Sequence, residues 1–213
     1  MTDVLLLADL HGNYGKLDAF LSYDYDAVII AGDITNFGPL EPVDSVLSNF
    51  EVPCFAIPGN CDPREIIDVL ERSDAVCLHD SWIALGKITL AGLGGSNKTP
   101  FDTPFELTEE EIDKELTRIV NHMDKNVHNV LLSHAPPYEA LDTVGEDHVG
   151  SRSIRKHMNR FDLVCCAHIH EARGITEVDG VTVVNPGPAS DGYGAIIHFG
   201  KEPKDIHIDL ITV

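Results

Sequence analysis

Short apolar runs that end in polar residues recur along this chain. The first three cover residues 4–8, 27–31 and 53–57, and each leads through a polar loop into a segment of amphipathic or helical character. This alternation predicts βαβ units around a parallel sheet, since such a connection returns the chain to the same end of the sheet. Ligands of open α/β sheets bind beyond the carboxyl ends of the strands. We therefore expect the chemistry of this chain at that one edge.

Seven polar side chains that follow such runs are candidate metal ligands. They come from five loops, the last two after apolar runs at 129–133 and 163–167: Asp9, His11, Asp33, Asn60, His134, His168 and His170. Any one of them alone is more often a surface or packing residue. Their shared position makes seven independent structural roles implausible, and mixed carboxylate, imidazole and amide ligands suit divalent transition metals. The sequence therefore predicts a metal site.

A site for two metal ions makes specific demands on these ligands. Ions about 3.5 to 4 Å apart need a bridging anion and separate donors on each side, and we expect Asp33 to be the bridge. His168 and His170 lie two positions apart after a strand, so their imidazoles are expected to point the same way and to meet one ion each. Asn60 offers an uncharged oxygen, which leaves more of the cationic charge for an anionic substrate.

The other segments predict further helices and strands within a single domain that spans residues 1–213. Helices are expected at 43–50, 62–72, 108–125 and 151–161, with Asp62 as the N-cap of the second and a Thr108–Glu111 capping box opening the third. Antiparallel strands are expected at 76–78, 82–85 and 88–91. The strands expected at 181–185, 195–199 and 206–211 are assigned to a second sheet.

The polar motifs, in their order along the chain, resemble those of the calcineurin-like metallophosphoesterases. The matching strings are Asp-Leu-His at 9–11, Gly-Asp at 32–33, Gly-Asn-Cys-Asp at 59–62, His134, and Ala-His-Ile-His at 167–170. The cysteine in the third string is similar to that of a small prokaryotic-type phosphodiesterase branch of the family. The resemblance implies a four-layer α/β/β/α sandwich, in which two mixed β-sheets are flanked by helices.

By the same resemblance, the site binds two divalent transition-metal ions. Manganese is the expected metal, with iron, zinc or nickel as alternatives. One ion is implied at Asp9, His11, Asp33 and His170, and the other at Asp33, Asn60, His134 and His168. The implied reaction is hydrolysis of a P–O bond by a metal-bound hydroxide. The implied catalytic residues are Asp33, Asn60, Cys61 and His134.

Cys61 stands where many members of that family carry histidine. An imidazolium supplies positive charge and a proton near neutral pH, whereas a thiol with a pKa of about 8.5 supplies neither well. A dianionic monoester loses most from this change, so the sequence predicts a preference for phosphodiesters. Because Cys61 precedes an expected helix start, its pKa is also expected to be lowered toward the thiolate.

Asn13 and the segment 98–108 also bear on the substrate. Asn13 completes an Asp-Leu-His-Gly-Asn string and joins Cys61 as a candidate substrate-binding residue, although capping of the first helix explains it equally well. The segment 98–108 contains two prolines and two phenylalanines. It is expected to overhang the metal site as a specificity loop.

The charge of the chain excludes several kinds of partner. Against 15 Lys and Arg stand 35 Asp and Glu, a formal charge of −20 that repels nucleic acids and anionic membranes. We expect a small phosphoester substrate, no nucleic-acid groove and no membrane partner, with a homo-oligomer left open. No apolar run approaches the length of a bilayer span, and the N-terminus lacks the basic residues of a signal peptide. A cytoplasmic location is expected.

Two alternatives to the phosphodiesterase hypothesis remain. A phosphomonoesterase or protein phosphatase uses the same kind of metal site on a different ester. A non-catalytic interaction scaffold on the same fold is the alternative from another class, and the complete ligand set argues against it.

Overall fold

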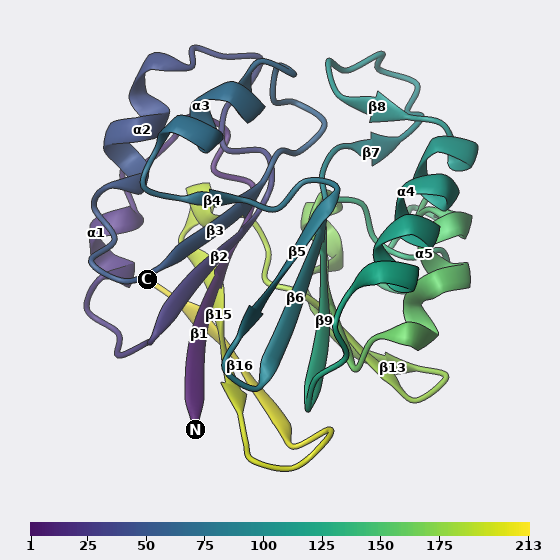
Figure 1. Cartoon of the computed structure of the whole chain (residues 1–213). Coiled ribbons are helices and arrows are strands. Elements are labelled where there is room, and N and C mark those ends of the chain that lie inside the picture. The colour runs from purple at the N-terminus through teal and green to yellow at the C-terminus, as the bar shows by residue number, and fades with distance from the viewer.

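Two six-stranded β-sheets face each other across a shared apolar core in the computed structural model, which describes all 213 residues (Figure 1). The first sheet has the order β16-β15-β1-β2-β3-β4 and the second β13-β14-β12-β9-β6-β5. Helices cover the outer face of each sheet. The expected four-layer α/β/β/α sandwich with two mixed sheets is confirmed.

The first sheet is built around parallel strands from the N-terminal half. These are β1 (Thr2–Leu7), β2 (Ala27–Ala31), β3 (Cys54–Ile57) and β4 (Val76–Cys77), joined by the antiparallel pair β15 (Tyr193–Phe199) and β16 (Ile206–Thr212). Alternate residues of β1 enter different cores: Val4 and Leu6 pack between the sheets, whereas Leu5 and Leu7 pack under the helices. Burial on both faces explains why the run is continuously apolar.

The second sheet has a parallel centre and antiparallel edges. Its parallel strands are β6 (Ile88–Leu93), β9 (His128–Ser133), β12 (Leu163–Cys165) and β14 (Val181–Asn185), and its edges are β5 (Ser81–Leu85) and β13 (Gly174–Val178). Two small pairs lie outside the sheets: β7 (Ser96–Asn97) with β8 (Glu106–Leu107), and β10 (Thr143–Val144) with β11 (Asp147–His148). The edge strand β13 and both small pairs were not predicted.

Helices α1 (Leu17–Phe20), α2 (Glu41–Leu47) and α3 (Ile66–Arg72) cover the first sheet, and α4 (Glu109–His122) and α5 (Arg152–His157) cover the second (Figure 1). The 3-10 turns η1 (Met158–Arg160), η2 (His170–Ala172) and η3 (Ala189–Asp191) complete the elements. The capping box is confirmed, since Thr108 accepts from the Glu111 N–H and Glu111 accepts from the Thr108 N–H. No helix combines the length and apolar character that a bilayer crossing requires.

Four expectations about the elements are wrong. Helix α3 begins at Ile66, so Asp62 is not its N-cap; the buried Asp62 carboxylate instead accepts from loop N–H groups. Strand β4 pairs in parallel with β3, in the first sheet. The C-terminal hairpin β15–β16 also joins the first sheet, because β15 pairs with β1. Helix α4 ends at His122, since the cap residue Met123 is already extended.

Candidate metal centre

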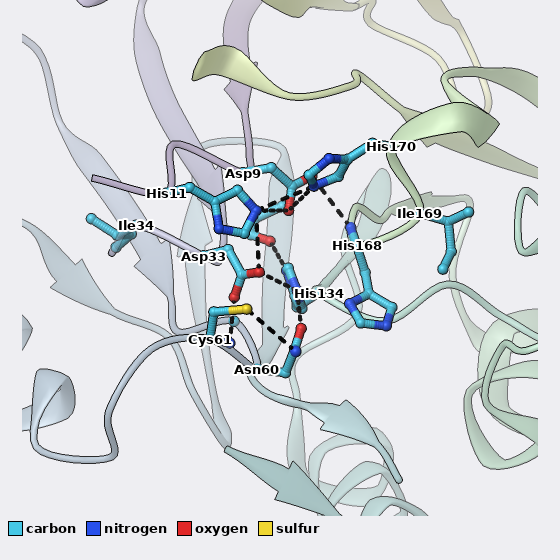
Figure 2. A network of polar contacts seen from close by, with 12 residues as sticks. Asp9, His11, Asp33, Ile34, Asn60, Cys61, His134, His168, Ile169 and His170 are labelled. Atoms are coloured by element: carbon cyan, nitrogen blue, oxygen red, sulfur yellow. Dashed lines mark hydrogen bonds and ion pairs between the residues drawn. The ribbon is translucent and has the colours of Figure 1, made fainter. Parts of the chain in front are cut away.

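Both sheets bring their carboxyl ends to one site. The loops after β1, β2 and β3 supply Asp9, His11, Asp33 and Asn60 from the first sheet, and those after β9 and β12 supply His134, His168 and His170 from the second (Figure 2). The ligand groups therefore meet across the interface between the two sheets.

Several candidate ligands sit on an unusual backbone. Asp9, His11, Asp33 and His168 have φ values of 53°, 47°, 49° and 71°. Left-handed φ is uncommon for residues other than glycine, and it gathers at functional sites where the surrounding structure holds it. Here it turns the chain sharply at the ends of β1, β2 and β12.

Asp33 lies at the centre of the group. Its Oδ2 is 3.6 Å from His11 Nε2 and 3.5 Å from His134 Nε2, and its Oδ1 accepts from the Cys61 N–H at 2.7 Å. Burial alone would raise the pKa of Asp33, but His134, His11 and the Cys61 N–H lower it. The carboxylate therefore stays ionised and faces imidazoles on both sides.

The position of the His134 proton leaves a lone pair facing the site. His134 Nδ1 lies 2.8 Å from the Ala31 carbonyl, so this nitrogen carries a proton and Nε2 carries none in the neutral ring. Nε2 lies 2.9 Å from Asn60 Oδ1. Burial alone would lower the pKa of His134, but the Asp33 carboxylate raises it to about 9. A proton or a cation is thus favoured between His134 Nε2, Asp33 Oδ2 and Asn60 Oδ1.

A second set of candidate metal-ligand atoms lies next to the atoms of Asp33, Asn60 and His134. His11 Nε2 and His170 Nε2 are 3.2 Å apart, and Asp9 Oδ1 lies 3.6 Å from His170 Nε2. Asp9 Oδ1 is buried and accepts no hydrogen bond. Because a buried carboxylate oxygen rarely lacks a partner, this atom fits a metal ligand. Three overlapping sets, Asp9/His11/His170, His11/Asp33/Cys61 and Asp9/Asp33/His134, each have ligand atoms within 4.8 Å of one another.

His168 lies at the margin of the group. Its backbone N–H donates to Asp9 Oδ2 at 3.3 Å, while its ring meets the His134 ring edge-on at a centroid distance of 5.1 Å (Figure 2). Burial lowers the pKa of His168 to about 4, with help from His134, so the ring is neutral. Neutral imidazole is the form that binds metal.

The two candidate substrate residues differ in their placement. Cys61 is part of the group, next to Asn60, but burial and the nearby Asp33 raise its pKa, so the expected shift toward the thiolate is wrong. Helix α3 begins five residues later and cannot stabilise a thiolate there. Asn13 is exposed and donates to the Ser190 carbonyl at 3.3 Å. It does not cap α1, whose N-cap is Lys16.

Asp62, which the sequence placed in a different role, supports the site. Its carboxylate accepts from the N–H groups of Ile34, Thr35 and Gly59 at 3.1, 2.7 and 2.8 Å, and from Thr35 Oγ1 at 2.9 Å. It thereby ties the loop that carries Asp33 to the loop after β3. The Gly-Asn-Cys-Asp string was the available signal for this role.

Thr103 contacts the site, and this contact was not predicted from the sequence. Its hydroxyl accepts from Asn60 Nδ2 at 3.1 Å, which orients Asn60 Oδ1 toward His134. Thr103 in turn donates to Glu106 Oε1 through both its N–H and its hydroxyl, at 3.0 and 2.8 Å. The segment 98–108 therefore contacts the site through Asn60, and no motif in the sequence marks that contact.

Comparison with known proteins agrees with this geometry. The family model described as calcineurin-like phosphoesterase matches residues 2–172. The chain belongs to that family. The uncharacterised protein MJ1162 of Methanocaldococcus jannaschii is 41% identical over 197 residues, which cover 86% of this chain and 87% of that protein.

Two solved structures share the fold at lower identity. A dimetal phosphatase from Danio rerio superposes with a TM-score of 0.65 at 11% identity, covering 99% of this chain and 98% of its own. A novel archaeal phosphodiesterase gives a TM-score of 0.50 at 17% identity, covering 98% and 99%. The family model and the shared fold thus place the chain among the metallophosphoesterases.

Proposed function

We propose that this chain is a dinuclear-metal phosphodiesterase that hydrolyses a small phosphoester in the cytoplasm, with manganese as its metal. The observation that carries the proposal is the set of converging ligand atoms, and above all Asp9 Oδ1, which is buried without a hydrogen-bond partner. The fold shared with a dimetal phosphatase supports two ions.

The proposed ligand sets are those that the family resemblance implies, and the close approaches of Asp9, His11, Asp33, Asn60, His134 and His170 support them, whereas the His168 ring contacts only the His134 ring. Asp9, His11, Asp33 and His170 would hold one cation, and Asp33, Asn60, His134 and His168 the other. Two divalent cations held by these residues would supply Lewis acidity for a water molecule and positive charge for the phosphoryl group. The Ala31 carbonyl keeps the proton of His134 on Nδ1, and Thr103 keeps the amide oxygen of Asn60 turned inward.

The ester preference depends on Cys61. Its pKa is raised by burial and by Asp33, and a thiol, unlike an imidazolium, supplies no positive charge to a second phosphoryl anion. A diester carries one negative charge and a monoester close to two, so the diester needs less neutralisation. The fold does not decide the ester, because it is shared with a phosphatase and with a phosphodiesterase.

The first test is a panel of phosphoesters assayed with Mn²⁺, Ni²⁺, Zn²⁺ and Mg²⁺. Wild type should hydrolyse bis(p-nitrophenyl) phosphate faster than p-nitrophenyl phosphate. Asp33→Ala should lose about 100-fold or more in kcat/KM, because it removes a central electrostatic group of the site. Asp18→Ala, at an exposed position on α1, is the matched control and should retain activity.

The second test changes the ester preference itself. Cys61→His should raise the monoester-to-diester rate ratio about tenfold or more, since it adds a proton donor beside the phosphoryl group. Cys61→Ala removes the thiol without adding an imidazole and should leave the ratio near wild type. A wild-type monoester rate well above the diester rate would favour a phosphomonoesterase or protein phosphatase instead. Purified protein without bound transition metal and without hydrolysis would favour the scaffold hypothesis.

A further inference from the structure

A pocket of about 350 Å³ opens beside the candidate metal centre, on the side of His168 and Ile169. One wall is the segment that carries Phe101, and the other is the β10–β11 hairpin with Val144 and Val149 near its ends. The side chains of these three residues are 80%, 43% and 38% exposed. Most large apolar residues of the chain are buried, so three exposed ones around one pocket mark a binding surface.

The two walls are held together by hydrogen bonds. Asn97 Nδ2 donates to the Val149 carbonyl at 3.0 Å, which links the 97–101 segment to the hairpin. The fully buried Asp142 stabilises the hairpin through two contacts. Its Oδ2 accepts from the Gly150 N–H at 3.0 Å, and its Oδ1 pairs with His148 Nδ1 at 2.7 Å. The pocket is therefore preformed, as ligand sites in proteins usually are.

The side chains of Asn97 and Thr99, which line the pocket, are already hydrogen-bonded. Thr99 donates its hydroxyl to Glu106 Oε1 at 2.5 Å, and Lys98 Nζ lies 3.8 Å from Glu106 Oε2. Burial would raise the pKa of Glu106, but hydrogen bonds from Thr99 and Thr103 lower it to about 2, so the partner of Lys98 stays charged. Beside the exposed Lys98, the walls offer a ligand mainly the apolar side chains of Phe101, Val144 and Val149.

The pocket is connected to the metal centre in two ways. His168 lines the pocket, and its ring also packs edge-on against the His134 ring. Glu106, which holds Thr99 in the pocket wall, also holds Thr103, and Thr103 orients Asn60. A substituent on a phosphoryl group bound at the centre is therefore within reach of the pocket.

We infer that this pocket binds an uncharged apolar group of the substrate, an ester substituent adjacent to the reacting phosphorus, with Phe101 as its main contact. The inference rests on the proposed function and adds a substrate class to it: phosphoesters with an aryl or similarly apolar substituent. A sugar is disfavoured, because Phe101, Val144 and Val149 line the pocket and the side chains of Asn97 and Thr99 are already hydrogen-bonded.

The test measures binding of two non-hydrolysable probes, phenylphosphonate and methylphosphonate, to the Mn²⁺-loaded protein by titration calorimetry. Wild type should bind the phenyl compound about tenfold more tightly, the scale on which apolar pockets discriminate. Phe101→Ala should reduce this ratio to near one and leave methylphosphonate affinity unchanged, because Phe101 is exposed and does not contact the candidate ligands. Ile175→Ala truncates another exposed apolar side chain, on β13 and outside the pocket lining, and should keep the wild-type ratio.

Equal affinities for the two probes in wild type, or an unchanged ratio in Phe101→Ala, would overturn the inference. So would the absence of binding by either probe. Failure of the proposed function has a different signature: no phosphoester is hydrolysed with any metal, whatever the ratio of the two phosphonate affinities.

Discussion

Replacing Gly59 with alanine tests whether the close packing of two loops sets the geometry of the centre. A Cβ at Gly59 would lie 2.1 Å from Asp33 Oδ1, 2.2 Å from Asp33 N and 2.7 Å from Asp33 Cγ. Gly59 is not among the residues with positive φ, so an alanine can adopt its backbone and the conflict is steric alone.

The size of the effect follows from these distances. Real Cβ atoms essentially never approach another heavy atom to less than 3.0 Å, so the separation of residue 59 from Asp33 Oδ1 and from the Asp33 backbone N must grow by roughly 0.9 and 0.8 Å. Misplacement by about 1 Å can cost about 100-fold in rate, and overpacking costs about 1 to 3 kcal/mol of stability. Gly59→Ala should therefore fold, lose about 100-fold in kcat/KM and bind less than the wild-type amount of metal.

The assay combines hydrolysis of bis(p-nitrophenyl) phosphate with Mn²⁺, metal content by mass spectrometry and thermal unfolding. Gly174→Ala is the matched control, because its Cβ would meet nothing closer than Leu141 Cδ2 at 3.6 Å. Metal content equal to wild type, together with kcat/KM within threefold of it, would refute the reasoning.

Three further predictions concern stability. Asp62→Ala should lower the free energy of unfolding by about 3 kcal/mol or more, because it leaves buried N–H groups without acceptors. The control, Asp68→Ala on the exposed surface of α3, should not lower it. Equal melting temperatures of the two variants would contradict this prediction. Burial and the nearby Asp80 raise the pKa of Glu115 from 4.5 to about 7. The folded state therefore binds the carboxyl proton of Glu115 more tightly than the unfolded state does. The stability that this difference contributes is lost as pH rises from 4.5 through 7. Glu115→Gln should thus raise the melting temperature at pH 8 but not at pH 4, and Glu110→Gln at an exposed site on α4 should raise it at neither; a gain at both pH values would count against this. Removing metal with a chelator should lower the melting temperature by roughly 5 to 10 °C. The reason is that metal at a concentration 100 times Kd stabilises the folded state by about 2.7 kcal/mol. An unchanged melting temperature would exclude tight metal binding.

The strands and the edge that carries the site could be predicted from the sequence because both depend on local patterns. Strand β2 was placed with its observed ends, since a β-branched apolar run followed by Gly32-Asp33 marks a buried strand and its terminus. The capping box at the start of α4 was also predictable, because its partners Thr108 and Glu111 lie within four residues of each other.

Features that depend on contacts between distant segments could not be predicted. The hairpin β15–β16 has the same apolar alternation whichever sheet it joins, and only its pairing with β1 decides the matter. Asp62 reads as a helix cap until its contacts with Ile34 and Thr35 are seen. Phe101 and Val149 are unremarkable in sequence, because the pocket they share arises only when their loops meet.

The pairing of β1 with β15 has a consequence for synthesis of the chain. Strand β1 is synthesised long before its antiparallel neighbour β15, which spans Tyr193–Phe199. Until that segment leaves the ribosome, one side of β1 presents unpaired N–H and C=O groups, as an exposed edge strand does. The strands that precede β15 can therefore assemble early and yet remain prone to strand-to-strand association until β15 is available to pair with β1. Truncation of the C-terminal hairpin should accordingly harm the protein through aggregation, although the hairpin contributes no candidate metal ligand.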